Sequence, residues 1–256
     1  MGRCKDIVLK VIPSSVAVPF VKKHHYSGKV VNNSCLHFGA FLDGHLHGVL
    51  SYGPSTDKRK MLGLVEGTQW DGFLELNRMA FDDYLPRNSE SYCIGATLRM
   101  IRKKAPQVKW IISFADGTQC GDGTIYRASN FILTGIKEND AIIELPNGEC
   151  IHQLCITSMP NTPRKELDGK TPAEIGSGAA GISAYLKYTG GKKKKGYQLR
   201  YIYFLDPKWR KRLTVPEIPF SKIDEMGAGM YKGENVTRAE RHAITTEQRK
   251  EEQNAK

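Results

Sequence analysis

The stretch VKWIISFADGTQCGDGTIYRASNF, residues 108–131, decides the fold class that we expect for this chain. Its first nine residues are almost all apolar, which is typical of a strand buried in the centre of a sheet. A glycine-rich loop follows, and GTIYRASNF then predicts a short helix. The loop has no lysine where a phosphate-binding P-loop needs one. It also lacks the third glycine of a dinucleotide fingerprint, so it fits neither template.

The segments on both sides of this stretch predict strands and helices in alternation. Apolar periodicity and turn residues predict strands at 6–12, 72–81 and 197–205, helices at 15–28 and after Asn88, and hairpins at 35–53 and 141–156. The first hairpin turns at Asp43-Gly44, a strong two-residue turn signal. Ile94, Leu98 and Ile101 make one apolar stripe on the second helix. This order predicts an α/β (α+β) fold with a mixed central sheet flanked by helices.

Composition places the chain among globular proteins of ordinary polarity. It has 256 residues, of which 40% are hydrophobic and 25% charged, and no apolar run approaches the length of a membrane span. We therefore expect no membrane partner. Six cysteines occur without a Cys-x-x-Cys pair, which argues against a structural zinc site and favours a reducing cytoplasm.

Charge is concentrated in one segment of the chain. The formal net charge is +11, and residues 192–212 hold nine Lys or Arg against one acid, Asp206. Concentrated basic charge favours a polyanion such as nucleic acid; a solvated lysine run is the alternative. We interpret the following residues as the set that binds DNA: Lys192, Lys193, Lys194, Lys195, Trp209, Arg210, Lys211 and Arg212.

Three domain regions are predicted from these patterns. Residues 1–220 are expected to form one catalytic domain, within which 160–196, rich in Pro, Gly and Lys, would be a basic insertion or arm. Residues 221–256 hold seven basic and seven acidic side chains and few aromatics, so we expect a polar, disordered tail.

Three stretches together resemble the bacteriophage Mom proteins. They are HHYSGK (24–29), ELNRMAFDDYLPRNSES (75–91) and SFADGTQCGDGTIYRASNFILTG (113–135), and the resemblance returns over YIYFLDPKWRKRL (201–213). It implies a fold related to the GNAT N-acyltransferases. It also implies conversion of adenine in phage DNA to N6-carbamoylmethyladenine, which protects that DNA from host restriction enzymes. Such an enzyme, encoded by a phage or prophage, would act in the cytoplasm of the host cell.

The chemistry implied by the resemblance needs a group that handles the N6 proton of a flipped adenine. Asp116 follows the central strand, where α/β sheets place their sites, and is our first candidate; a turn-capping aspartate is the alternative. Ser113 reaches that site only if the strand is bulged, and otherwise its hydroxyl bonds to backbone. For Tyr126 the resemblance implies protonation of the leaving group, with a core tyrosine as the alternative.

Further candidates lie in the 72–81 strand and in the first helix. Glu75 and Asn77 share a strand face and are candidate catalytic residues, whereas Arg78 points to the other face unless a bulge intervenes. Because an arginine in an apolar strand needs a partner, Arg78 is a candidate for binding the donor. His24, His25 and Tyr26 could wall the base pocket, or could be surface residues of a helix.

The acyl donor is left open by the sequence. Acyl-CoA enzymes carry two small residues, usually glycines, in the loop that cradles the pyrophosphate, whereas residues 87–92 read RNSESY and keep only the arginine. Arg87, Asn88 and Ser91 are therefore candidates for a phosphate or ribose of the donor, with plain helix capping as the alternative for Asn88. A glycyl group has the heavy atoms of the product group, whereas an acetyl group lacks its nitrogen. Acetyl-CoA and glycyl-tRNA both remain candidate donors.

The expected partners are double-stranded DNA with a flipped adenine and, if the donor is aminoacylated, tRNA. His45 and His47 share a strand face without a third ligand, so we expect a solvated hairpin rather than a metal site. Two other functions compete with DNA modification. One is a CoA-dependent acetyltransferase that acts on a protein or small amine, and the other is a non-catalytic DNA-binding protein.

Overall fold

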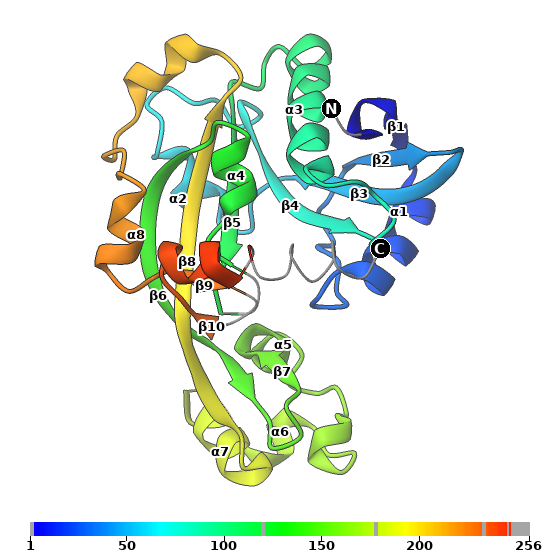
Figure 1. Cartoon of the computed structure of the whole chain (residues 1–256). Coiled ribbons are helices and arrows are strands. Elements are labelled where there is room, and N and C mark those ends of the chain that lie inside the picture. Colours follow the sequence, from blue (N-terminus) through cyan, green and yellow to red (C-terminus); the bar gives the residue numbers. More distant parts are fainter. Residues whose placement is uncertain (1–2, 119–120, 177–178, 232–233, 245, 247–256) are drawn as a thin grey trace. The chain divides into compact units, whose positions relative to one another are not determined.

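The computed structural model describes the chain except for residues 1–2, 119–120, 177–178, 232–233, 245 and 247–256 (Figure 1). The described part forms two compact units. Unit 1 comprises residues 1–115, 122–135 and 199–226, and unit 2 comprises 116–121, 136–198 and 227–256. Both units draw residues from 1–220, the range predicted to form one catalytic domain.

The mixed central sheet is confirmed. It has the strand order β1-β2-β3-β4-β5-β8-β6-β7. Pairing is antiparallel from β1 to β4 and parallel between β4 and β5. The strands are β1 (Val8–Ile12), β2 (Leu36–Leu42), β3 (His45–Gly53), β4 (Phe73–Phe81), β5 (Trp110–Asp116), β6 (Ile132–Glu144), β7 (Cys150–His152) and β8 (Lys192–Phe204). The β2–β3 hairpin turns at Asp43 (φ 52°) and Gly44 (φ 82°), as the sequence predicted.

Unit 1 places helices on both faces of its strands. On one face of β3, Val49 packs in one cluster with Ala17 and Val21 of α1 (Ser14–His24). Tyr52 lies on the opposite face of β3, where its hydroxyl is 2.7 Å from Thr97 Oγ1 of α3 (Ser89–Lys104). Shorter helices of the unit are η1 (Arg3–Asp6), α2 (Lys58–Leu62), α4 (Thr124–Ala128), η3 (Pro207–Arg212) and α8 (Ser221–Glu225).

Unit 2 has a core of its own. Ile143, Leu145, Ile151, Leu167 and Tyr185 are among its buried residues. Its helices and short strands are α5 (Gln153–Thr157), η2 (Lys165–Leu167), α6 (Pro172–Ile175), α7 (Ala179–Thr189), β9 (Met230–Tyr231) and β10 (Glu234–Asn235).

Three predicted segments differ from the structure. Residues 160–196, expected to be an insertion or arm, contain η2, α6 and α7 and begin β8, and apolar side chains such as Leu167 and Tyr185 are buried there. The second strand of the 141–156 hairpin ends at His152, and α5 follows. The segment from 221, expected to be disordered, buries Ile223 and Met230. Residues 247–256 of that predicted tail lie outside the described part.

Candidate active site

Strand β4 carries a bulge that brings the predicted residues to one face. Ser51 of β3 pairs with Arg78, but the next residue, Tyr52, pairs with Leu76, so Asn77 is the extra residue of β4. Glu75 pairs with Gly53, two residues beyond Ser51 on β3. Residues 51 and 53 share a face, and the bulge therefore places Glu75 and Arg78 on the same face, which regular alternation would have separated.

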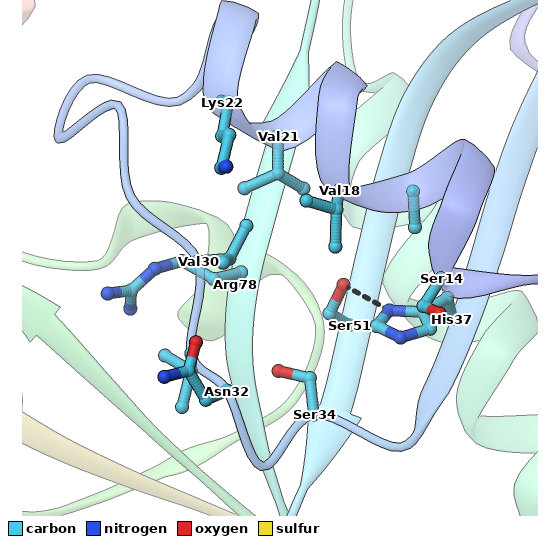
Figure 2. A pocket seen from close by; sticks show the side chains of 12 residues that line it. Ser14, Val18, Val21, Lys22, Val30, Asn32, Ser34, His37, Ser51 and Arg78 are labelled. Carbon is cyan, nitrogen blue, oxygen red and sulfur yellow. Dashed lines mark hydrogen bonds between the residues drawn. The ribbon is translucent and has the colours of Figure 1, made fainter.

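A pocket of about 370 Å³ lies beside this bulge (Figure 2). Its walls come from α1, the loop before β2, and strands β2, β3 and β4; the lining residues are Ser14, Ala17, Val18, Val21, Lys22, Val30, Val31, Asn32, Ser34, His37, Ser51 and Arg78. Val18 and Val21 point from α1 toward the strands, and a hydrogen bond of 2.8 Å joins His37 and Ser51 on the strand side. One wall is therefore apolar and the other polar, a combination that is typical of small-molecule sites.

Arg78 is held by backbone carbonyls. Its Nε donates to the Lys29 carbonyl at 3.0 Å and its Nη1 to the Asn77 carbonyl at 2.7 Å. The expected partner of Arg78 is thus main-chain oxygen, which does not neutralise the positive charge of the guanidinium. Arg78 contributes a positive charge to the pocket that it lines.

Asn77 has a buried hydrogen-bond donor without a partner. Only 6% of the residue is exposed, and Oδ1 accepts a hydrogen bond from Ser34 Oγ at 2.8 Å. Nδ2 has no partner among the described residues. An unsatisfied buried N–H costs about 1–3 kcal/mol and is rare in folded proteins, where strain, a bound water or ion, or a catalytic role explains it.

His25 is neutral at ordinary pH. Burial first, and then the charge of Arg78, lower the pKa of the imidazole to about 4. Nδ1 accepts from the Ser27 N–H at 3.2 Å and lies 2.8 Å from Ser27 Oγ. Because a backbone N–H can only donate, the imidazole proton is on Nε2, and His25 offers a donor there. The ring of Tyr26, 54% exposed, lies 4.2 Å from that of His25, while His24 stacks on Phe20.

The pKa of Glu75 is raised. Burial is the main cause, and a hydrogen bond from Ser55 and the charge of Arg78 work against it. A carboxyl of this kind is a better proton acceptor than an exposed glutamate, because its conjugate acid is weaker. The structure thus brings Glu75, Asn77, Arg78 and His25 into one neighbourhood of unit 1.

Ser113 and Tyr126 also belong to unit 1, where each has partners of its own. Ser113 is fully buried, and its hydroxyl donates to the Leu76 carbonyl at 2.9 Å, as the alternative interpretation expected. The β4–β5 ladder ends one residue earlier, at the pair Glu75–Ile112. Tyr126 is 8% exposed and packs with its ring 5.3 Å from that of Tyr201.

The glycine-rich loop before Tyr126 is held by a buried ion pair. Asp122, 2% exposed, lies 3.3 Å from Arg127 Nη2, and the Tyr201 hydroxyl donates to the Asp122 carbonyl. Gly123 adopts φ 79°, and a Cβ there would lie 2.6 Å from the Tyr201 ring. Glycine is required at this position by both the backbone conformation and the close approach of a side chain.

Asp116 belongs to unit 2. Its Oδ1 accepts from the Thr118 N–H at 3.1 Å and from Asn139 Nδ2 at 3.4 Å. This is the turn-capping arrangement that the alternative interpretation expected. Residues 119–120 of the loop lie outside the described part, and a site shared by Asp116 and Tyr126 stays a prediction.

The predicted donor-binding residues surround the start of α3. Asn88 has φ 66° and its side chain does not cap the helix. Ser91 Oγ donates to the Asn88 carbonyl at 3.1 Å, and Arg87 is exposed. An exposed cation beside a helix N-terminus without a side-chain cap suits a phosphate group. The acceptor role of Asn88 in capping is not seen.

The predicted DNA-binding residues fall into two sets, one in each unit. Lys192–Lys195 begin β8 in unit 2. There Lys193 pairs with Asp140 at 2.8 Å and Lys194 with Glu144 at 3.7 Å. In unit 1, Trp209 packs against a core cluster that includes Trp110. Two of the four lysines thus form ion pairs with acids of the protein, and the Trp209 ring packs against the core of unit 1.

Metal binding has no support in the described ranges. No group of three or more His, Cys, Asp or Glu is close enough there to hold an ion. His47 instead lies 2.8 Å from Asp82 and stacks on Tyr84 at 4.2 Å. In the same ranges, every helix is too short or too polar to cross a membrane.

Several residues of the site were not found from the sequence. Ser34 and Ser55 come from loops, and only the fold brings them to Asn77 and Glu75. The polar run VVNNSC, residues 30–35, is the signal that could have pointed to Ser34, because it lies between a helix and a strand near the HHYSGK stretch.

Solved structures with a related arrangement are acetyltransferases. An N-acetyltransferase from Staphylococcus aureus gives a TM-score of 0.42 at 8% identity and covers 78% of this chain and 98% of its own. An IAA acetyltransferase from Bacillus cereus gives 0.41 at 9% identity, with 77% and 99% covered. TM-scores this low carry no conclusion about function.

Sequence comparison is more decisive. A model described as the Mom protein family matches residues 6–222, and the chain belongs to that family. A protein named methylcarbamoylase mom, from Escherichia phage Mu, is 35% identical over 212 residues, which cover 82% of this chain and 80% of the phage protein. The resemblance seen in three short stretches thus extends over most of the chain.

Proposed function

We propose that this protein converts adenine in phage DNA to N6-carbamoylmethyladenine and so protects that DNA from host restriction. Membership of the Mom family and the relative named methylcarbamoylase support the reaction class. The observation that carries the site is the buried Nδ2 of Asn77, which has no hydrogen-bond partner in the described part of the chain and lies next to Arg78, a residue that lines the pocket. As a phage or prophage product, the enzyme would act in the host cytoplasm.

The pocket beside β4 would hold the flipped base. Flipping costs a few kcal/mol, which the pocket must offset by contacts with the base. Val18, Val21 and Val30 offer an apolar wall, and the exposed ring of Tyr26 could cover the entrance. Arg78 would exclude a protonated base, because its charge disfavours a second cation nearby.

Two residues of β4 would carry the chemistry. Glu75, whose pKa is raised, would accept the N6 proton as the amine attacks the acyl carbon and displaces the CoA thiolate or the tRNA. A glycyl group on N6 would then rearrange so that its methylene is bonded to N6 and its nitrogen to the carbonyl, whereas the acetyl route needs a separate nitrogen source and an oxidant. Asn77 Nδ2, which has no partner among the described residues, would donate a hydrogen bond to the acyl oxygen of the donor, on which negative charge develops in the transition state. Tyr126 and Asp116 stay candidates for protonating the leaving group and orienting the base.

The donor would be an activated acyl compound held through phosphate at the start of α3. Arg87, which is exposed beside the start of α3, would contact the phosphates of CoA or of tRNA alike, whereas Glu90 in the first turn opposes an anion there. Incubation with DNA and each radiolabelled donor separates the two. Label transferred to DNA from acetyl-CoA alone eliminates glycyl-tRNA, and the reverse result eliminates acetyl-CoA.

Mass spectrometry of nucleosides from cells tests the proposal. DNA from cells that express the protein should contain a new adenosine species, and DNA from cells expressing Asn77→Leu should not. Asn147→Asp, in an exposed turn of unit 2, is the matched control and should behave as wild type. Tight CoA binding without any new nucleoside would favour an acetyltransferase acting on a protein or small amine.

A further inference from the structure

Two basic segments that are distant in sequence lie side by side in unit 1. One is Lys58-Arg59-Lys60 in α2, and the other is PKWRKR, residues 207–212, in η3. Just after them the chain forms an antiparallel bridge between Val65 and Leu213. Two backbone hydrogen bonds flank it, from Glu66 N to the Arg212 carbonyl at 2.8 Å and from Thr214 N to the Leu64 carbonyl at 3.0 Å. Neither basic segment contains an acid.

A shared core fixes these segments in place. Met61 of α2 and Trp209 of η3 belong to one cluster with Phe73 and Trp110. With these apolar side chains turned inward, Arg59, Lys60, Lys208 and Lys211 are exposed. The arrangement is therefore a fixed surface rather than two independent charge runs.

Most of the positive charge on this surface is not neutralised by protein. Arg210 is paired with Glu217 at 2.5 Å. Arg59, Lys60, Lys208 and Lys211 have no ion pair with a carboxylate in the described part of the chain. These four cations are available to an external anion.

An exposed tryptophan stands at the edge of the same surface. Trp70 is 59% exposed, and Lys58 Nζ lies 4.5 Å from its ring centroid. Its loop touches η3, since a Cβ on Gly67 would lie 3.0 Å from Arg212 Nη1. A large exposed ring among cations is poorly explained by stability, and it suits stacking on a base or sugar.

We propose that this surface, Lys58–Lys60 with Trp70 and residues 207–212, binds the phosphate backbone of the duplex that flanks the target adenine. This inference rests on the proposed function for the identity of the nucleic acid. Phosphate contacts would position the duplex without reading its sequence, and Trp70 would contact an exposed base or sugar near the flipped nucleotide. Lys192–Lys195 are not part of this surface.

The test uses the full chain carrying Arg59→Gln, Lys60→Gln and Lys211→Gln together. Its matched control is Arg102→Gln, Lys103→Gln and Lys104→Gln, three consecutive exposed cations at the end of α3 that change the net charge equally. Circular dichroism first verifies that both variants fold. Affinity for a labelled duplex is then measured by fluorescence anisotropy over a range of salt concentrations.

The surface variant should bind the duplex more weakly at 0.1 M salt, by about eightfold for each phosphate that it no longer neutralises. Its plot of log affinity against log salt should be shallower by about 0.9 for each such phosphate, whereas the control should match wild type. Duplex should also quench tryptophan fluorescence less in Trp70→Phe than in wild type, because Trp110 is fully buried.

Equal affinity and equal salt dependence of the two triple variants would overturn the proposal. Weaker binding of tRNA with unchanged binding of duplex would overturn it in favour of RNA. Nucleoside analysis separates this inference from the proposed function. If wild type makes no modified adenine but its duplex affinity depends on these residues, only the proposed function fails; if modification occurs and the surface variant binds normally, only the surface fails.

Discussion

The substitution Asn77→Leu should abolish DNA modification without destabilising the protein. Leucine has a similar size, lacks the unpartnered N–H and cannot accept the hydrogen bond from Ser34. Removal of the buried donor should stabilise unit 1 by about 1–3 kcal/mol, and loss of the Ser34 bond should cost about 0.5–1.5 kcal/mol. The Ser34 hydroxyl, which is only half-buried, can turn to water.

The expected net change in unfolding free energy therefore lies between about −0.5 and +2.5 kcal/mol, where positive values are stabilising. All three tryptophans of the chain, Trp70, Trp110 and Trp209, belong to unit 1, so urea unfolding followed by tryptophan fluorescence reports on that unit. Modification activity is measured on the same preparations by nucleoside mass spectrometry.

The control for this prediction is Ser34→Ala, which removes the same hydrogen bond from the other side. It leaves Asn77 Oδ1 without its partner as well as Nδ2, so unit 1 should lose about 1–3 kcal/mol. A loss of more than about 1.5 kcal/mol in Asn77→Leu would show that the amide serves stability. Retained modification in that variant would refute its role in the reaction.

Three other measurements probe the same unit. Glu75→Gln should lower modification about 10²–10⁴-fold. Because the raised pKa of Glu75 lets the folded state hold this proton to higher pH, the unfolding free energy of wild type should fall as pH rises above the ordinary glutamate pKa. The variant has no carboxyl at this position and should lack that pH dependence. The His25 Cε1–H resonance should titrate near pH 4 by NMR, and a midpoint near 6.5 would contradict its burial beside the arginine. Both Gly123→Ala and Gly44→Ala place a side chain at positive φ, which costs about 1–2 kcal/mol. Gly123→Ala should lower the stability of unit 1 further in urea titrations, because only there does the new Cβ clash with the Tyr201 ring. Equal losses of stability would mean that the ring moves aside.

The sequence predicted the sheet because its signals are local. Alternation, the Asp43-Gly44 turn and the apolar run of β5 depend on neighbouring residues, and the structure contains all of them. In the segment 160–196 the Pro, Gly and Lys content indicated an insertion or arm but did not reveal its helices, which depend on a few buried side chains such as Leu167 and Tyr185.

The site was less predictable because it depends on a bulge and on distant pairings. Glu75, Asn77 and Arg78 were candidates from the sequence, but alternation placed Arg78 on the wrong face, and the extra residue in β4 corrects this. Nothing local shows that Ser34 meets Asn77, or that α2 meets η3. Conversely, the hydroxyl of Ser113 and the carboxylate of Asp116 are engaged with nearby backbone N–H or C=O groups, which composition cannot reveal.

The most direct test of the account is a reaction with purified components. Wild-type protein, Asn77→Leu and Asn147→Asp are incubated with unmodified duplex DNA and each candidate donor, and the nucleosides are analysed by mass spectrometry. With wild type and Asn147→Asp the account predicts N6-carbamoylmethyladenine if glycyl-tRNA is the donor and an N6-acetyl precursor if acetyl-CoA is the donor, and with Asn77→Leu it predicts no modified adenine. Absence of any modified adenine with wild type and either donor, or its formation by Asn77→Leu, would contradict the account.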